Sequence, residues 1–284
     1  MTTFNQAVHQ AKQACMAQGI PSETVMSYLF EIANMEKYNL YMQFDEEMPA
    51  ALYAQFQAGL KRILNHEPLA HILGYSWFYG YKFKVNEDVL IPRYETEELV
   101  AQILARKDQY FKDQQVTAID VGTGSGAIAI SLKKEEDSMD MYASDISEAA
   151  IAVAKHNAQA NEAKVNFMVG DMLQPFIAQN MQVDILVSNP PYIPNDEKLE
   201  TEVVDHEPHV ALFGGSDGLD FYRTILKNCH KLLKPRSFMA FEIGYNQFLA
   251  LEQEIQKYCP DATYEILKDI NGKDRMLFVY FNLA

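Results

Sequence analysis

Apolar side chains recur at intervals of three and four positions over the first seventy residues, which is the period of a helix that buries one face. One such stripe spans residues 25–32 and a second spans residues 52–64. Ser22 followed by Glu23 resembles a helix start, with a capping side chain and a negative charge in the first turn. The pattern predicts a small bundle of helices over residues 1–73.

The period changes to two after this helical region. Large apolar or aromatic residues occupy alternate positions from Trp77 to Val85, with Gly80 in their midst. Alternation favours strands with one buried face, and a central glycine favours a tight turn between them. We therefore expect a β-hairpin over residues 74–92 that links the helical region to the rest of the chain.

From residue 93 to residue 284, short β-branched runs alternate with helical stretches, a pattern typical of a parallel sheet with crossover helices. Asn271–Gly272, between the last two runs, is a hairpin signal that makes the final pair antiparallel. The predicted fold class is α/β, with a seven-stranded Rossmann-like sheet after the helical domain and hairpin. The expected strands are 116–121, 141–145, 165–169, 183–188, 237–243, 262–268 and 275–281.

The composition is that of a soluble globular protein rather than a disordered one, since 48% of the 284 residues are apolar and 22% are charged. No run approaches the length of a membrane span, and the opening residues lack the apolar core of a signal peptide. We expect a cytoplasmic protein. The three cysteines are too widely spaced for a disulfide framework or a thiolate zinc site.

A glycine-rich turn follows the first predicted strand of the sheet and opens a helix of small apolar residues. Such a turn lets the backbone approach a ligand closely, and the amides of the helix start favour negative charge. Its G-x-G-x-G spacing differs from the G-x-G-x-x-G of dinucleotide enzymes, which disfavours a nicotinamide oxidoreductase. A tight strand-to-helix turn without a ligand is the alternative. The turn consists of Gly122, Thr123, Gly124, Ser125 and Gly126.

Carboxylates end the next two predicted strands. Asp145 lies nineteen residues after Gly126, where an acidic side chain can accept hydrogen bonds from both hydroxyls of a ribose. Its alternative role is to cap the helix that begins near Ser147. Asp171 and Met172 follow the third strand, at the sheet edge where α/β proteins bind ligands, and are candidates to border an adenine. Asp171 is equally suited to a plain turn.

The fourth predicted strand ends in Asn189-Pro190-Pro191-Tyr192. The two prolines fix the backbone and remove two N–H donors, so few internal donors compete for the acceptors of this turn. The Asn189 side-chain carbonyl and the Pro190 carbonyl can accept both hydrogens of a planar NH2 group, while the Tyr192 ring offers a flat face. A proline-rich loop without function is the alternative, which the neighbouring glycine turn disfavours.

Together the glycine turn and Asn-Pro-Pro-Tyr resemble S-adenosylmethionine-dependent methyltransferases that act on amide or exocyclic amino nitrogens. Two further segments narrow the resemblance to the protein-(glutamine-N5) methyltransferases of peptide-chain release factors. These segments are Ile91–Glu98 (IPRYETEE) and Glu207–Leu219 (EPHVALFGGSDGL).

The resemblance implies a methyl transfer from S-adenosylmethionine to the glutamine of the release factor's Gly-Gly-Gln loop, with S-adenosylhomocysteine as the product. It implies substrate recognition by residues 1–73 and a methyltransferase domain over residues 93–284. The implied catalytic residues are Asn189, Pro190 and Tyr192, and Pro191 joins them in binding the substrate. The implied cofactor-binding residues are Gly122, Thr123, Gly124, Ser125, Gly126, Asp145, Asp171, Met172 and Asn189.

Charge bears on the partner. The chain carries a net charge of −15, and nine acidic residues against one lysine lie between Met181 and Asp220. An acidic rim around the pocket repels a phosphate backbone, so no direct nucleic-acid binding is expected. We also expect a monomer and no membrane association. No metal is expected, because the spacing of Asp205, His206, Glu207 and His209 is not that of metal ligands.

Two other functions stay open on the residues alone. A nucleic-acid adenine-N6 methyltransferase is one, because the Asn-Pro-Pro-Tyr turn accepts an adenine amino group equally well. The acidic rim and the lack of an added basic domain disfavour it. A non-catalytic, cofactor-binding adaptor of the translation machinery is the other, which the intact turn disfavours.

Overall fold

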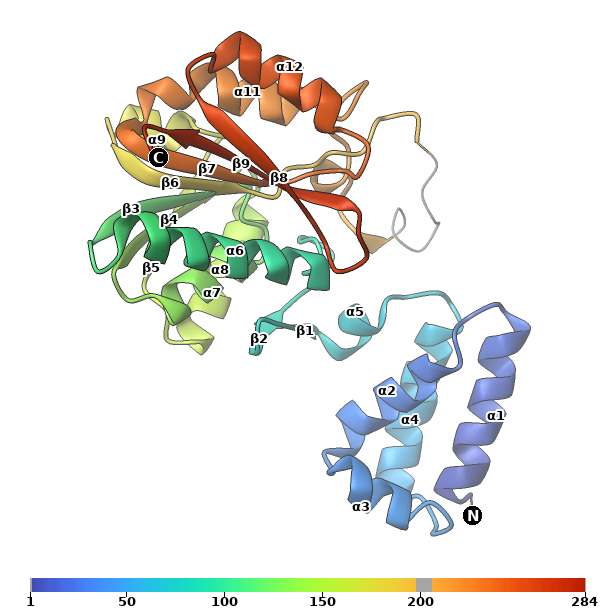
Figure 1. Cartoon of the computed structure of the whole chain (residues 1–284). Coiled ribbons are helices and arrows are strands. Elements are labelled where there is room, and N and C mark those ends of the chain that lie inside the picture. Colours follow the sequence, from blue (N-terminus) through green and yellow to red (C-terminus); the bar gives the residue numbers. More distant parts are fainter. Residues whose placement is uncertain (1, 198–205, 284) are drawn as a thin grey trace. The chain divides into compact units, whose positions relative to one another are not determined.

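The structure, a computed structural model, describes residues 2–197 and 206–283 (Figure 1). Two compact units follow one another along the chain. The first comprises the described residues up to Tyr75 together with His206, and the second comprises the other described residues from Ser76 onward. Each unit buries its own set of apolar side chains.

The first unit is helical, as the spacing of its apolar residues predicted. Its core includes Phe4, Leu29 and Phe56, which come from three different helices and are fully buried. Ser22 precedes its helix as expected, but its hydroxyl donates to the Glu23 carboxylate instead of accepting from the backbone. The helices are α1 (Phe4–Ala17), α2 (Glu23–Ala33), α3 (Lys37–Met42), α4 (Ala50–Ile63) and α5 (Leu69–Leu73).

A β-hairpin of β1 (Tyr75–Phe78) and β2 (Tyr81–Lys84) follows. Gly80 adopts a φ of +79° in its turn, a conformation that favours glycine. The pairing is shorter than residues 74–92, because the chain turns after β2: the Asn86 side chain accepts from the Asp88 amide and donates to the Asp88 carboxylate.

The second unit holds a seven-stranded sheet in the order β5-β4-β3-β6-β7-β9-β8. All neighbouring pairs from β5 to β7 are parallel, and β9 is antiparallel to both β7 and β8. This confirms the predicted sheet, its seven strands and its antiparallel final pair. The strands are β3 (Val116–Val121), β4 (Met139–Asp145), β5 (Val165–Val169), β6 (Val183–Ser188), β7 (Leu233–Glu242), β8 (Thr263–Lys268) and β9 (Asp274–Phe281).

Helices cover both faces of this sheet, because its strands carry buried apolar residues on each side (Figure 1). One apolar cluster packs α6 (Tyr94–Phe111), α7 (Ala127–Glu135) and α8 (Glu148–Ala160) against the strands. The other packs α9 (Gln174–Ala178), α11 (Asp220–Asn228) and α12 (Phe248–Tyr258). Short 3-10 turns occupy His209–Ala211 and Cys229–Lys231.

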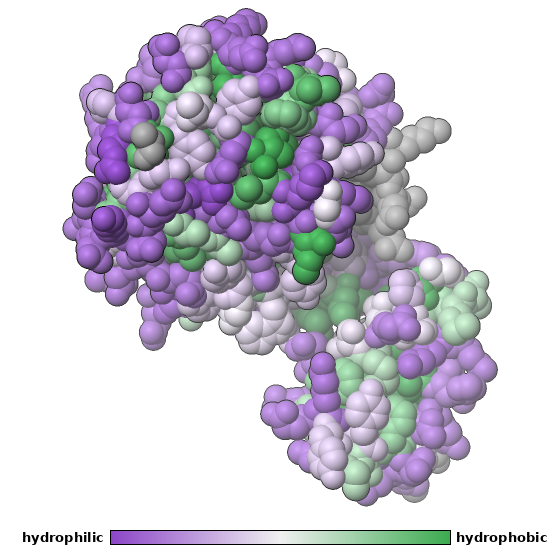
Figure 2. All heavy atoms as spheres, viewed as in Figure 1, coloured by the Kyte–Doolittle hydropathy of each residue, from purple (hydrophilic) through white to green (hydrophobic). Residues whose placement is uncertain are grey.

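Figure 2 shows a face of the sheet unit that is largely hydrophilic, with scattered apolar side chains. Within the two described ranges, no helix combines the length and the apolar character that crossing a membrane requires.

Candidate active site

A cavity of about 220 Å³ opens at the carboxyl ends of β3, β4 and β6. This is the edge of a parallel sheet where ligands bind, because the loops that follow the strands converge there. The start of α6 and the segment after β2 close its sides. Its lining includes Phe78, Arg93, Thr96, Gly122, Thr123, Gly124, Ser125, Asp145, Asp171, Met172, Asn189, Pro190, Pro191 and Val210.

The glycine turn forms one wall of the cavity. Gly122 and Gly124 have φ values of +74° and +54°, and a Cβ on either one would meet nothing within 4 Å. Glycine at these two positions therefore permits the left-handed backbone conformation and leaves open space in front of the turn. Thr123 and Ser125 also line the cavity, whereas Gly126 is the N-terminal cap residue of α7 and does not.

Gly126 allows two helices to pack closely. A Cβ at this position would lie 2.8 Å from Ile130 Cδ1 and 3.2 Å from Ala154 Cβ, and the residue has a φ of +83°. We expect Gly126→Ala to lower the free energy of unfolding by about 2–4 kcal/mol, from backbone strain and this overlap together. Denaturant titration measures the loss. Gly272→Ala, with φ +76° and nothing within 4 Å, is the matched control for strain alone, and equal losses would contradict the packing role.

Asp145 braces the loops on either side of the cavity. Its Oδ2 accepts from the Gly124 amide at 2.9 Å, and its Oδ1 accepts from the Ser147 amide at 2.9 Å. The N-terminal cap of α8 is Ser147, whose hydroxyl accepts from the Ala150 amide. Each carboxylate oxygen keeps a further lone pair. Asp145 lines the cavity, so the ribose role stays a prediction that this geometry allows.

Asp171 and Met172 line the cavity as well. The Asp171 carbonyl accepts from the Gln174 amide, so this residue also turns the chain into α9. Met172 has a φ of +48°, and its carbonyl accepts from the Ser144 hydroxyl at 3.2 Å. The carbonyl is thereby tied to the end of β4, and this tie fixes the Met172 backbone at the cavity wall.

The Asn-Pro-Pro-Tyr turn divides between the cavity and the core. Asn189, Pro190 and Pro191 line the cavity, but Tyr192 is absent from its lining. The Tyr192 ring packs with the buried cluster under α11 and α12, and its hydroxyl is 3.4 Å from Glu242 Oε1. A stacking role for Tyr192 therefore stays a prediction.

Two polar residues that the sequence did not single out complete the site. Asn189 Nδ2 donates to Thr96 Oγ1 at 3.3 Å, and Thr96 Oγ1 donates to Glu242 Oε2 at 2.5 Å. Thr96 lies inside the conspicuous segment 91–98. Glu242 is an acidic residue at the end of an otherwise apolar stretch of β7, which is the signal that could have found it.

Burial perturbs a carboxyl beneath the glycine turn. Asp120 is fully buried at the end of β3, and this burial raises its pKa to about 7. The Thr123 hydroxyl donates to its Oδ2 at 2.7 Å, which favours the ionised form and opposes the shift. Thr123 lines the cavity and donates to Asp120. The glycine turn is therefore hydrogen-bonded to a carboxyl whose charge changes near neutral pH.

We expect this group to make stability depend on pH. Because the folded-state pKa lies above the ordinary value of 3.8, the folded chain binds the proton more tightly than the unfolded chain. The protonated carboxyl contributes fully below about pH 4, and the contribution is lost as the pH rises to about 7. The melting temperature of Asp120→Asn relative to the unchanged chain should therefore be higher at about pH 8 than at about pH 5. A pH-independent difference would contradict this assignment.

The acidic rim is smaller than predicted. Asp184 lies at the opposite end of β6, where it accepts from the Thr117 amide and pairs with Lys234. Glu207 is buried, pairs with Arg93 and accepts from the Ile91 amide at 3.1 Å. These two carboxylates face cations and amides inside the fold, so counting them in the rim was wrong. Glu200, Glu202 and Asp205 lie outside the described residues.

Family models match both parts of the chain. Residues 97–208 match a model described as a methyltransferase small domain, and residues 6–74 match a model described as the PrmC N-terminal domain. A solved methyltransferase from Pyrococcus furiosus shares the fold alone, at 16% identity and a TM-score of 0.53, over 79% of this chain and 98% of that one.

Full-length relatives are more similar. A release factor glutamine methyltransferase of Bacillus cereus is 41% identical over 252 residues, which is 88% of this chain and 89% of that protein. One of Bacillus subtilis is 39% identical over 280 residues, 98% of this chain and 97% of that protein. At this identity and coverage, the chain belongs to the family of release factor glutamine methyltransferases.

Proposed function

We propose that this chain transfers a methyl group from S-adenosylmethionine to the N5 amide nitrogen of the glutamine in the Gly-Gly-Gln loop of peptide-chain release factors. The observation that carries the proposal is the orientation of Asn189. Its Nδ2 is taken up by Thr96, which leaves its carbonyl Oδ1 as the acceptor for a ligand in the cavity. An amide substrate offers two N–H donors to such an acceptor.

The part of the cavity lined by the glycine turn, Asp145, Asp171 and Met172 suits S-adenosylmethionine. A cradle of glycines with open space in front of Gly122 and Gly124 suits close approach of a ligand to the backbone. The Asp145 carboxylate, next to it, suits a pair of ribose hydroxyls, and Asp171 and Met172 suit the border of an adenine. The cofactor supplies a methyl carbon that is electrophilic because it is bonded to a sulfonium.

The residues of the turn at the end of β6 address the weak nucleophilicity of an amide nitrogen, whose lone pair is delocalised into its carbonyl. Asn189 Oδ1 and the Pro190 carbonyl accept the two N–H groups and so orient the nitrogen for attack. They also stabilise the positive charge that develops on nitrogen during transfer. The methylated nitrogen then releases a proton to water, so the chain needs no general base.

A transfer assay tests the proposal. Unmodified release factor, incubated with this protein and methyl-labelled S-adenosylmethionine, should acquire label. A release factor in which the Gly-Gly-Gln glutamine is replaced by alanine is the matched control and should acquire none. Equal labelling of both factors would contradict the assignment of the target residue. In a parallel reaction that contains RNA, label in the RNA and none in the release factor would favour the adenine alternative.

We propose further that the helical unit binds the protein substrate. On α3, Tyr38 and Met42 expose 72% and 68% of their surface and lie four positions apart, so they form an exposed pair on one face of the helix. We expect Tyr38→Ser combined with Met42→Ser to raise KM for the release factor by about tenfold, with kcat changed by less than about twofold. Steady-state kinetics measures both constants. Ile270→Ser, an exposed apolar residue of the sheet unit, is the control, and an unchanged KM in the double variant would contradict the role.

We infer that the enzyme acts as a cytoplasmic monomer without direct contact to nucleic acid. The net charge of −15 supports the absence of nucleic-acid contact, because it opposes binding to a phosphate backbone.

A further inference from the structure

A chain of hydrogen bonds runs from the cavity wall into the core of the sheet unit. It begins at the Asn189 amide, passes through the Thr96 hydroxyl at the start of α6 and ends on the Glu242 carboxylate at the end of β7. Thr96 and Glu242 are 4% and 3% exposed, so solvent does not compete for these contacts. The chain joins three elements that are far apart in sequence.

The direction of each hydrogen bond follows from the chemistry of its last member. An ionised carboxylate can only accept hydrogen bonds, so the single hydrogen of the Thr96 hydroxyl is committed to Glu242. Thr96 Oγ1 can then only accept from Asn189, and it therefore selects the NH2 end of that amide. The opposite end of the amide, Oδ1, is left for the cavity.

We propose that Thr96 and Glu242 are positioning residues that hold the Asn189 amide in the orientation that accepts a hydrogen bond from the substrate. The proposal rests on the proposed function of Asn189. Without the relay, the two ends of the amide differ little in shape, and a reversed Asn189 would present two donors to the donors of the substrate amide.

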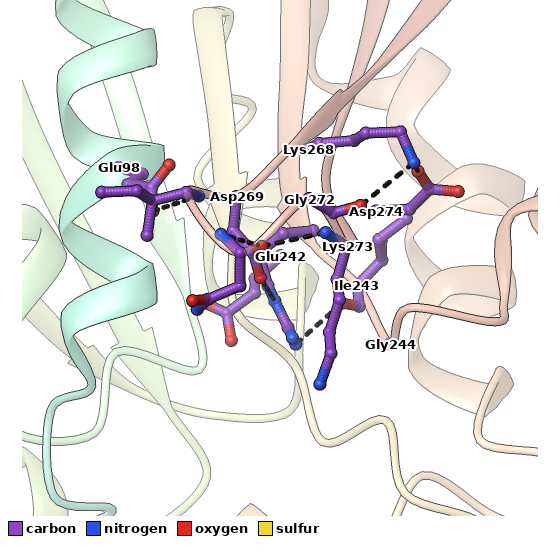
Figure 3. Close-up of polar contacts among 12 residues, drawn as sticks. Glu98, Glu242, Ile243, Gly244, Lys268, Asp269, Gly272, Lys273 and Asp274 are labelled. Carbon is purple, nitrogen blue, oxygen red and sulfur yellow. Dashed lines mark hydrogen bonds and ion pairs between the residues drawn. The ribbon is translucent and has the colours of Figure 1, made fainter.

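A partly buried cation beside Glu242 supports its ionised form. Arg275, at the start of β9, donates to the Ile243 carbonyl at 3.4 Å and to Asp269 Oδ2 at 3.2 Å. Asp269 is fixed in turn by the amides of Asn271 and Lys273 in the β8–β9 turn, close to Glu242 and Ile243 (Figure 3). The turn therefore holds the guanidinium near the end of β7.

The protonation state of Glu242 sets the direction of the relay. Burial raises the pKa of Glu242, with Glu95 adding to the shift, while Thr96, Arg275 and Tyr192 oppose it. A protonated Glu242 could donate to Thr96, which frees the Thr96 hydroxyl to donate to Asn189 Oδ1. The reversed relay withdraws the acceptor, so the rate of methyl transfer should fall as the pH drops through the pKa of Glu242.

Substitutions that preserve shape test the relay. We expect Thr96→Val to lower the single-turnover rate of methyl transfer by about tenfold, the size of one hydrogen bond of ordinary strength, with the cofactor Kd changed by less than about twofold. Thr96→Ser should restore the rate because it restores the hydroxyl. Glu242→Gln should lower the rate and remove the acidic limb that Glu242 contributes to the pH profile. Asp184→Asn, a buried carboxylate at the other end of β6, is the matched control.

A measurement without substrate separates this proposal from the proposed function. In the free enzyme, the side-chain NH2 of ¹⁵N-labelled Asn189 should exchange slowly with solvent because Thr96 accepts from it, and Thr96→Val should speed that exchange. If the unchanged enzyme fails to methylate release factor, the proposed function fails while the exchange result still decides the relay. Equal exchange in the two proteins, or a Thr96→Val rate within about threefold of the unchanged enzyme, would overturn the relay.

Discussion

Asn189→Ala is expected to lower the single-turnover rate of methyl transfer by about 10²–10³-fold, the range seen when one preorganised group that stabilises a transition state is removed. The physical reason is that, in the proposed mechanism, Asn189 Oδ1 accepts a hydrogen bond from the substrate nitrogen on which positive charge develops. Rapid-quench measurement at saturating cofactor and release factor gives this rate directly.

The cofactor Kd should change far less in this variant, by about threefold or less, because the glycine turn and Asp145 remain in place. Asn166→Ala, the same substitution at an exposed position of β5, is the control. A rate for Asn189→Ala equal to that of the control would remove Asn189 from the chemical step.

Asp145→Ala should raise the Kd for S-adenosylmethionine by about 10²-fold, since it would remove the two charge-assisted hydrogen bonds that we propose between Asp145 and the ribose. The loss has a second source in this structure. Without the carboxylate, the amides of Gly124 and Ser147 lose their acceptor and the two loops beside the cavity lose their brace. Isothermal titration of the unchanged and variant proteins with the cofactor measures both Kd values.

The control for this substitution comes from the same strand. Asp140→Ala removes an exposed carboxylate from the other end of β4 and should leave the cofactor Kd unchanged. Asp145→Asn should lie between the two, because its remaining oxygen still accepts. A Kd for Asp145→Ala within about threefold of the unchanged protein would contradict the ribose role.

Most of the sheet was predictable from local pattern. The strands 116–121, 165–169 and 183–188 were expected at the bounds that the structure gives, because short apolar runs between turn signals define them. β7 begins at Leu233, earlier than the predicted start at residue 237. The prediction missed this part of the strand because Lys234, Pro235 and Arg236 do not resemble a strand sequence. The structure shows Leu233 paired with Val183 of β6, a long-range contact that overrides this local preference.

The candidate site likewise contains residues that the sequence predicts and residues that it does not. The glycine turn and Asn189 to Pro191 stand together in the cavity wall because each follows a strand of one parallel sheet, which sequence order reveals. Thr96 and Glu242 are 146 positions apart, and no local pattern predicts their hydrogen bond. Glu207 was misjudged because its partners, Arg93 and the Ile91 amide, lie 114 and 116 positions away from it in the sequence.

Spacing also fails to show where a side chain points after a rigid turn. Tyr192 follows two prolines, and its backbone carbonyl accepts from Gln247 Nε2 at 2.8 Å, while its hydroxyl approaches Glu242. These contacts hold the residue toward α12 and β7 rather than in the cavity lining. The stacking role that the sequence suggests for Tyr192 stays a prediction.

The proposed function is tested most directly by mass spectrometry of unmodified release factor after incubation with this protein and S-adenosylmethionine, with peptide mapping of any added methyl group. The proposed function predicts a single methyl on the side-chain nitrogen of the Gly-Gly-Gln glutamine, and about a hundredth of that amount or less after the same brief incubation with Asn189→Ala. A folded release factor that gains no methyl there, while the enzyme binds the cofactor, would contradict it.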